Sequence, residues 1–298
     1  MPRSQGPRPV LLNLLISMRP GQWTKNLFVF AALVFAQRLN DTDAVLLSFA
    51  AFLIFCALSS TIYLINDVLD REQDRRHPLK INRPIASGAV SPALALSVAA
   101  VTGAVAIVAA AAVNWAFLQM AVAYVVLLSG YSAFLKHIVI LDVLTIAAGF
   151  TLRAASGAAA ISVPISHWLL VCTTLLALFI ALSKRRHELT LLTETAIDHR
   201  PILGDYTPYL LDQMISVVTA STLIAYAFYT ISPETTEKFG TDLLSLTIPF
   251  PLYGIFRYLY LVHRRDQGGS PAELVVNDRP LLVCVALWAF SVVAIIYQ

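Results

Sequence analysis

The sequence predicts an all-α, polytopic membrane protein with nine transmembrane helices. Apolar residues make up 58% of the 298-residue chain, charged residues make up 13%, and the mean hydropathy is +0.72. These values lie well outside the averages of soluble proteins. The apolar residues also fall into nine segments, each close to the roughly 20 residues that cross a bilayer as a helix.

The nine expected spans follow one another along the whole chain. The segment VLLNLLISM, before the first span, is expected to form an interfacial helix that Pro20 stops. It is brief and lacks a small-residue cleavage site, so no cleavable signal peptide is expected. Residues 1–23 are therefore assigned to a cytoplasmic or interfacial N-terminal segment. The expected spans are 24–38, 45–65, 93–113, 116–135, 138–160, 167–183, 213–231, 243–262 and 280–297.

Positive charge is distributed unequally between the two sides of the predicted bundle. Of the 21 Lys and Arg residues, only Arg38 and Lys238 fall in connections on the side away from the N-terminus. The positive-inside rule makes the N-terminal side cytoplasmic. We therefore expect a multi-pass protein of the inner or plasma membrane, with its N-terminus in the cytoplasm.

The longest polar connections lie on the cytoplasmic side, at 66–92, 184–212 and 263–279. None is long enough to fold separately, so we expect 1–298 to form a single integral membrane domain. The chemistry is expected at the cytoplasmic face. The cysteines lie in apolar runs, which favours core packing over a disulfide or a thiolate metal site; they are Cys56, Cys172 and Cys284.

An acidic cluster follows the second expected span. On a helix prolonged from that span, Asn66, Asp70 and Asp74 are four residues apart, and Asp67 joins them within an arc of roughly 100°. Carboxylates stacked on one helix face repel one another unless a cation lies between them. Oxygen ligands of this kind suit Mg²⁺, which commonly joins carboxylates to substrate phosphates. The pattern predicts a magnesium site.

A solvated helix end is the alternative to a metal site. Three arginines interleave with the acids and could neutralise them in salt bridges; these are Arg71, Arg75 and Arg76. Tyr63, one turn before Asn66, points to the same face and is most simply a core residue.

Polar and basic residues gather at the ends of several expected spans. An ionisable group inside a span is costly to bury, so a functional role is the default for Arg153, with Asp142 as a conceivable partner. Each cation alone could be a topology anchor or a phospholipid contact. Together, beside the acidic cluster, they favour a cavity that holds a polyanion with its metal. The other members are Lys25, Lys80, Arg83, Tyr131, Lys136, Lys184, Arg185, Arg186 and Glu188.

Several motifs resemble those of the UbiA superfamily of intramembrane prenyltransferases. NDVLDREQD resembles its NDxxDxxxD motif, and YSAFLK resembles its YxxxLK element. The resemblance implies nine helices, Mg²⁺ dependence and an active cavity that opens at the cytoplasmic membrane face. It extends to one branch, which transfers a 5-phosphoribosyl group from 5-phosphoribosyl diphosphate (PRPP) to decaprenyl phosphate for cell-wall arabinan. The stretches similar to that branch are MRPGQWTKNLFVF, DREQDRRHPLKINRPIASG, GFTLRAASGA and SKRRHEL.

One departure from the superfamily pattern distinguishes its branches. Typical members carry a second DxxxD motif after the sixth span, where a further Mg²⁺ meets a prenyl diphosphate, whereas this chain has SKRRHEL. Cations in place of acids remove a metal site and create an anion site. PRPP carries a 5-phosphate besides its diphosphate, so this change fits PRPP better than a prenyl diphosphate. Glu194, Asp198 and Asp205 do not restore the missing motif.

The resemblance implies substitution at ribose C1, with an oxygen of the lipid phosphate as the nucleophile and diphosphate as the leaving group. Asn66, Asp67, Asp70 and Asp74 would hold Mg²⁺, and Asp70 and Asp74 would thereby serve catalysis. Asp142 would orient the ribose or support positive charge at C1. The residues expected to bind substrate are Lys25, Tyr63, Lys80, Arg83, Tyr131, Lys136, Arg153, Lys184, Arg185 and Glu188.

Two other functions stay open. A UbiA-type prenyltransferase would move an isoprenoid from a prenyl diphosphate to an aromatic or other acceptor, and the missing second acidic motif counts against it. A transporter would place charges near the bilayer midplane within repeated halves, whereas these charges concentrate at one face. Membrane lipids are expected partners, nucleic acid is not, and a homo-oligomer stays open.

Overall fold

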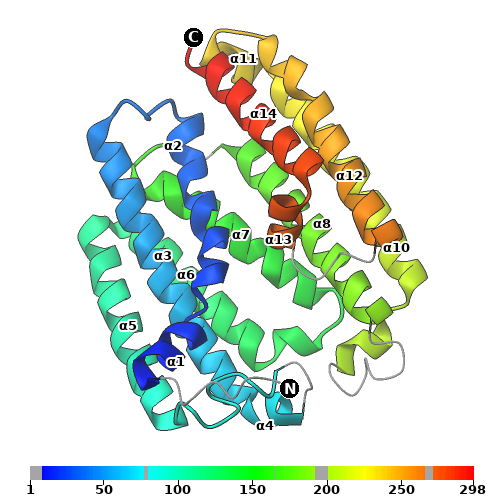
Figure 1. Ribbon diagram of the computed structural model, residues 1–298. Coiled ribbons are helices and arrows are strands. Elements are labelled where there is room, and N and C mark those ends of the chain that lie inside the picture. The colour runs from blue at the N-terminus through cyan, green and yellow to red at the C-terminus, as the bar shows by residue number, and fades with distance from the viewer. Residues whose placement is uncertain (1–8, 77–79, 165, 192–200, 266–270) are drawn as a thin grey trace.

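The computed structural model describes residues 9–76, 80–164, 166–191, 201–265 and 271–298. Every regular element in these ranges is an α-helix or a 3₁₀ helix, and no strand occurs among them. The predicted all-α class is therefore confirmed (Figure 1).

Within the described ranges, seven helices are long and apolar enough to cross a membrane, so the protein is a multi-pass membrane protein. Short polar side chains start most of them, because such a side chain can accept a hydrogen bond from a first-turn backbone N–H. The helices are α3 (Thr42–Leu69), α5 (Pro92–Val113), α6 (Trp115–Ala133), α7 (Leu141–Ala160), α8 (His167–Leu191), α10 (Pro208–Ile231) and α14 (Arg279–Ile296).

Shorter helices complete the described chain. Those before α8 are α1 (Val10–Ser17), η1 (Pro20–Phe30), α2 (Ala31–Phe35), α4 (Arg71–Arg76) and η2 (Leu135–His137). Those after α8 are η3 (Pro201–Asp205), α11 (Pro233–Phe239), η4 (Leu243–Thr247), α12 (Pro249–Arg265) and α13 (Pro271–Asn277).

The predicted count of nine spanning helices is not exact. The expected span 24–38 is divided between η1 and α2, because residues 20–30 wind as a 3₁₀ helix of unusual length. The expected span 243–262 passes the length and hydropathy test only together with α11, from which it is bent by 106°. Gly240 ends α11 with a left-handed conformation, which a glycine adopts without steric cost. The described residues thus hold seven such helices, or eight if the bent pair is one span.

The first helix, α1, ends before Pro20, as the sequence predicts. Its polar residues Asn13 and Ser17 are buried against the protein, and the Ser17 hydroxyl donates to the Asn13 carbonyl over 2.9 Å. Its apolar residues, among them Leu11 and Leu15, are exposed. This inverted pattern suits a lipid environment, and the interfacial placement stays a prediction.

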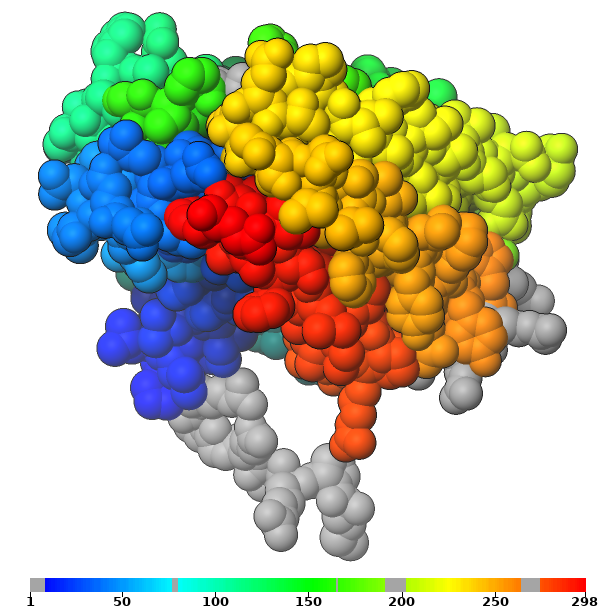
Figure 2. All heavy atoms as spheres, turned by 90° about the horizontal axis from the view of Figure 1, so that it is seen from above, coloured from blue at the N-terminus to red at the C-terminus, as the bar shows by residue number. Residues whose placement is uncertain are grey.

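The bundle has two distinct ends. α1 and α4 lie at one end, here called the α4 end, whereas α2 and α11 lie at the other (Figure 1). The last helix, α14, contacts the first part of the chain at the end of the bundle opposite α4. There the Gln37 side-chain amide donates to the Ile296 carbonyl over 2.5 Å, and α14 lies between the α2–α3 region and the α10–α12 region (Figure 2).

The central helix of the bundle is α7. It packs against α6, α8, η1 and α3, and most of its residues are buried. Its C-terminal half is rich in Ala, Gly and Ser, and small side chains allow helices within a membrane to approach closely. α7 therefore joins two apolar clusters, one around α3, α5 and α6 and one around α8, α10 and α12.

Candidate active site

The acidic cluster lies at the junction of α3 and α4, at the α4 end. α3 ends at Leu69, yet the Asp70 and Asp74 backbone N–H groups still donate to the carbonyls of Asn66 and Asp70, each over 2.8 Å. The helical register therefore continues through the junction. The predicted spacing of Asn66, Asp70 and Asp74 along one helical path is confirmed.

Each carboxylate of the acidic cluster is paired with a cation. Lys136 Nζ lies 2.6 Å from Asp70 Oδ1. Arg83 Nη1 lies 2.6 Å from Asp74 Oδ2 and 3.2 Å from Asp67 Oδ1, so one guanidinium bridges two acids. Two of the expected substrate-binding cations thus contact the expected metal ligands.

Further groups contact the same acids. Arg19 pairs with Asp67, and Lys80 Nζ lies 3.8 Å from Asp74 Oδ1. The Asn66 amide donates to Asp70 Oδ2 over 2.9 Å. The cations expected for a solvated helix end do not pair with these acids in the described residues; these are Arg71, Arg75 and Arg76.

The chemistry of the acidic cluster fits Mg²⁺, because it offers three carboxylates and an amide oxygen. Asp67 and Asp74 are only 2% exposed, and their oxygens face cations. No group of three or more His, Cys, Asp or Glu side chains in the described ranges is placed to hold a metal ion. The cations here relieve the repulsion that a metal would otherwise relieve, and the metal-ligand assignment stays a prediction.

A second charged group involves the segment SKRRHEL, whose charged residues Lys184, Arg185, Arg186 and Glu188 we call the cationic motif. Asp142, at the start of α7, is fully buried and accepts from Arg185 Nε over 2.8 Å. Arg185 Nη1 lies 2.7 Å from Glu188 Oε2. Its Nη2 donates to the Tyr131 hydroxyl over 3.5 Å. Arg185 is therefore held in one orientation by three side chains.

The other two cations of the motif, Lys184 and Arg186, differ in their exposure and in their partners. Lys184 is 45% exposed, and its Nζ lies 3.9 Å from Glu188 Oε1. Arg186 instead pairs with Asp212 at 2.5 Å, which ties α8 to α10. His263 of α12 also contacts Asp212, at 3.3 Å. Arg186 thus has a structural partner, whereas Lys184 can be reached from outside.

Arg153 is buried within the bundle and does not contact Asp142, so the suggested pairing is wrong. Its guanidinium donates to the Asn26 side-chain oxygen at 2.8 Å, the Tyr124 hydroxyl at 2.6 Å and the Gly149 carbonyl at 2.9 Å. These partners are neutral, and none of the described carboxylates pairs with Arg153. Arg153 therefore joins η1, α6 and α7.

Lys25 is positioned by the unusual contact between η1 and α7. A Cβ added to Gly157 would lie 1.9 Å from the Val29 carbonyl oxygen, so only glycine allows this approach. The neighbouring Asn26 is fully buried and also donates to Ser59 Oγ over 3.3 Å. These contacts fix the backbone that carries Lys25.

Lys25 itself is half-buried and has no ion pair among the described residues. The charges that act on it most strongly are those of Lys184, Arg153 and Arg19, all positive. Cations therefore gather around Lys25, and neither Lys25 nor Arg153 pairs with a carboxylate among the described residues, which favours an anionic ligand. Tyr63 helps to position Arg19, because the Arg19 guanidinium lies over the Tyr63 ring, 4.8 Å from its centroid.

Sequence reasoning missed three residues that position this site: Arg19, Asn26 and Tyr206. Arg19 pairs with Asp67, and Asn26 bonds Arg153. The Tyr206 hydroxyl donates to Asp142 over 2.8 Å. Asn26 could have been noticed as an amide within an apolar run. The partners of the other two are distant in sequence and leave no local signal. Glu194 and Asp198 lie outside the described residues.

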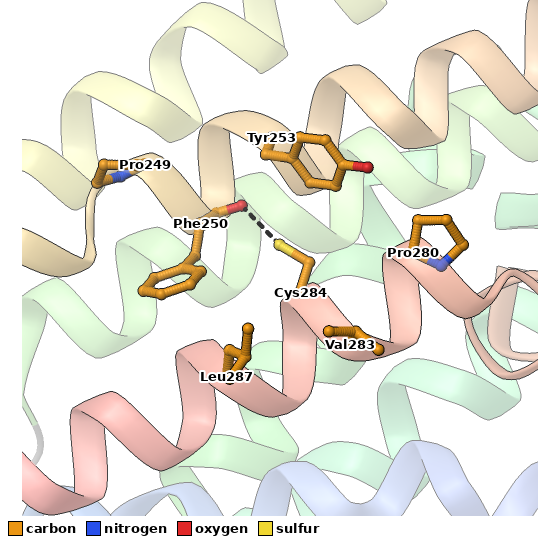
Figure 3. Close-up of a pocket in the computed structure, with 7 residues that line it drawn as sticks. All are labelled: Pro249, Phe250, Tyr253, Pro280, Val283, Cys284 and Leu287. Carbon is orange, nitrogen blue, oxygen red and sulfur yellow. Dashed lines mark hydrogen bonds between the residues drawn. The ribbon is translucent and has the colours of Figure 1, made fainter.

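One hollow among the described residues is lined by no residue of the acidic cluster or the cationic motif. It has a volume of 420 Å³ and lies between α12 and α14 (Figure 3). Its lining consists of Pro249, Phe250, Tyr253, Pro280, Val283, Cys284 and Leu287. No charged side chain is among them, so this groove offers nothing for phosphate chemistry. The cytoplasm-facing cavity stays a prediction.

Comparisons with known proteins agree with the motifs. The model of the UbiA prenyltransferase family matches residues 26–277. The decaprenyl-phosphate phosphoribosyltransferase of Corynebacterium glutamicum is 32% identical over 306 residues, which cover 99% of this chain and 90% of that protein. The protein of the same name from Mycolicibacterium smegmatis is 32% identical, with 99% of this chain and 96% of that protein covered.

A solved structure supports the fold. The UbiA homolog from Archaeoglobus fulgidus, determined with DMAPP and Mg²⁺ bound, superposes with a TM-score of 0.72 at 19% identity. The superposition covers 95% of this chain and 99% of that one. Because the family model spans most of the bundle and the relatives match almost end to end, this chain belongs to the UbiA prenyltransferase family.

Proposed function

We propose that this protein transfers a 5-phosphoribosyl group from PRPP to decaprenyl phosphate and releases diphosphate, in the supply of cell-wall arabinan. The observation that carries the proposal is the cationic motif, which replaces the second acidic motif of the wider family. Arg185 is held there by Asp142 and Glu188, at 2.8 and 2.7 Å. Relatives that match nearly end to end and bear the name decaprenyl-phosphate phosphoribosyltransferase support the same reading.

The diphosphate of PRPP binds at the acidic cluster. Asn66, Asp67, Asp70 and Asp74 would hold Mg²⁺, which would supply positive charge to neutralise the leaving diphosphate. Lys136 and Arg83 now neutralise these acids, at 2.6 Å in each case. With the donor bound, Lys136, Arg83 and Lys80 would contact phosphate oxygens, which would leave the carboxylates to hold the ion.

The 5-phosphate of PRPP binds at the cationic motif. Lys184 and Arg185 donate to its oxygens, and Lys25, which has no ion pair among the described residues, adds positive charge beside them. Tyr131 and Glu188 hold the Arg185 guanidinium in position. Asp142 is fully buried and acts through Arg185 rather than on the ribose.

The acceptor is a lipid phosphate, whose oxygen is already anionic at neutral pH, so no strong general base is required. The bond between C1 and the diphosphate oxygen breaks, and diphosphate leaves with the electron pair. The bond between C1 and the lipid phosphate oxygen forms. Fixed cations stabilise the charge that moves to the leaving group. The lipid tail lies among apolar helices that open to the bilayer.

The proposal places the α4 end at the cytoplasmic face of the inner or plasma membrane, where PRPP is soluble and accessible. Most Lys and Arg residues fall in connections on this side, which supports the orientation. The chain acts as one domain over 1–298.

A transfer assay tests the proposal. Purified protein in lipid receives decaprenyl phosphate and Mg²⁺, with either ribose-labelled PRPP or a labelled prenyl diphosphate. Label from PRPP should enter the lipid fraction, and a metal chelator should stop the transfer. Transfer of a labelled isoprenoid to an added aromatic acceptor would instead support the general prenyltransferase activity that the family name suggests. Failure of both arms in a folded protein would contradict both enzymatic readings.

A further inference from the structure

The Tyr206 hydroxyl joins two parts of the candidate site. Tyr206 follows η3 and is only 3% exposed. Its hydroxyl donates to Asp142 Oδ1 over 2.8 Å, and the Ile140 backbone N–H donates to it over 2.8 Å. A single oxygen atom therefore makes two hydrogen bonds, one to a buried carboxylate and one to the backbone.

The backbone at Ile140 is in a conformation that needs support. Ile140 has a φ of 69° and a ψ of −44°, which is unfavourable for a β-branched residue. It also occupies the N-cap position of α7, where its apolar side chain offers no hydrogen bond to the helix. The hydrogen bond that the Ile140 N–H donates to the Tyr206 hydroxyl holds this strained turn.

Each of the two hydrogen bonds of the Tyr206 hydroxyl connects it with one of the cations expected to bind phosphate. Through Asp142 the hydroxyl orients Arg185, whose Nε lies 2.8 Å from the other carboxylate oxygen. Through Ile140 it fixes the turn that follows η2, and η3 itself packs on η2. η2 carries Lys136, which lies 2.6 Å from Asp70. Tyr206 thus connects the cationic motif, through Asp142, with the segment that carries Lys136.

We infer that Tyr206 is a positioning residue for the donor, whose hydroxyl fixes the separation between Lys136 and Arg185. PRPP has a diphosphate at one end and a phosphate at the other, so the two cations must stand at a fixed separation to bind both ends at once. The inference rests on the proposed function, because it assigns Lys136 and Arg185 to the two ends of that donor.

The protonation state of Tyr206 supports the arrangement. Burial, and the hydrogen bond to the Asp142 carboxylate, raise the pKa of Tyr206 to about 12. The hydroxyl therefore keeps its proton through the physiological range and continues to donate. The groups that face it are Ile140, Asp142 and Arg185. Its contribution should not change between about pH 6 and pH 9.

Substitution Tyr206→Phe removes only the hydroxyl. A matched control is Tyr226→Phe, since the Tyr226 hydroxyl is also buried and also makes two bonds. It lies 2.6 Å from Thr247 Oγ1 and accepts from the Trp288 indole over 2.8 Å. Tyr226 lies in the second half of α10 and contacts none of the charged groups of the site.

The steady-state kinetics of both variants decide the inference. Tyr206→Phe should raise the KM for PRPP about tenfold, leave kcat within about threefold, and leave the KM for decaprenyl phosphate within about twofold. The same change in the KM for PRPP should appear at pH 6.5 and pH 8.5. Tyr226→Phe should lower the melting temperature without changing the KM for PRPP.

Two results would overturn the inference. One is a Tyr206→Phe variant whose KM for PRPP stays within twofold of the wild-type value. The other is a Tyr226→Phe variant with the same rise, which would mark a general effect of destabilisation. Should Tyr206→Phe fail to fold, Asp142→Asn decides instead, because the inference requires a selective rise in the KM for PRPP there as well. Wild-type protein that does not use PRPP would overturn the proposed function first, and this inference with it.

Discussion

Lys136 and Asp70, 66 residues apart in the chain, form an ion pair of 2.6 Å at the α4 end of the bundle. Lys136 belongs to the YxxxLK element and Asp70 to the acidic motif, so two motifs that resemble the family pattern meet in one contact. The pair is mostly buried, with side-chain exposures of 14% and 22%. It brings together the group that we propose binds phosphate and the group that we propose binds Mg²⁺.

The first prediction concerns Asp70. Substitution Asp70→Asn keeps the shape and removes the charge, so it should weaken Mg²⁺ binding and reduce kcat/KM by at least about a thousandfold. Glu72→Gln is the matched control, because Glu72 is exposed and pairs only with Arg75 in the described residues, at 3.1 Å. It should retain near-normal activity. Near-normal turnover of Asp70→Asn in saturating Mg²⁺ would remove Asp70 from the site.

The second prediction concerns metal removal. Because Arg19, Arg83 and Lys136 already neutralise the acids, the substrate-free protein should not depend on Mg²⁺ for stability. A chelator should abolish transfer yet shift the melting temperature by less than about 2 °C. Melting curves with and without chelator, measured before PRPP is added, check this. A large fall in the melting temperature would show that a resident ion holds the acidic cluster together.

The third prediction concerns the contact between η1 and α7. A methyl group at residue 157 would lie 1.9 Å from the Val29 carbonyl oxygen. This oxygen belongs to the backbone, so no side-chain rotation can relieve the clash. Gly157→Ala should therefore destabilise the protein by about 1–3 kcal/mol and lower activity by displacing Lys25. In Gly254→Ala the nearest atoms lie 3.9 Å from the new methyl, so stability should be unchanged or slightly raised. Equal melting temperatures for the two variants would contradict the account of η1.

The sequence predicts best what depends on local spacing. The long apolar helices follow from hydropathy, and the placement of Asn66, Asp70 and Asp74 follows from helical periodicity. The irregular first apolar segment, η1 followed by α2, is not visible in this way. It depends on Gly157 and Arg153, which lie more than a hundred residues further along the chain.

The partners of the charged residues were beyond sequence reasoning for a similar reason. Arg19 meets Asp67 across 48 residues, and Tyr206 meets Asp142 across 64. No spacing rule links residues so far apart, because packing of the whole bundle brings them together. The conceivable pair of Asp142 and Arg153, both in α7, is not formed. Asp142 pairs instead with Arg185 of α8.

The central claim is that the cationic motif binds a phosphate of PRPP in place of a second metal site. Lys184 is 45% exposed, whereas Arg186 is held by Asp212 at 2.5 Å. The two residues carry equal charge and lie two positions apart on α8. A comparison of Lys184→Ala with Arg186→Ala therefore separates phosphate binding from a general contribution of positive charge.

The decisive measurement is kcat/KM for PRPP in these two variants, each checked for correct membrane insertion. A hydrogen bond to a charged phosphate contributes about 1.5–3 kcal/mol, so Lys184→Ala should lose roughly tenfold to more than a hundredfold in kcat/KM. Arg186→Ala should lose stability through Asp212 but little in kcat/KM for PRPP. Equal and small losses at both positions would contradict the account and favour a prenyl diphosphate as the donor.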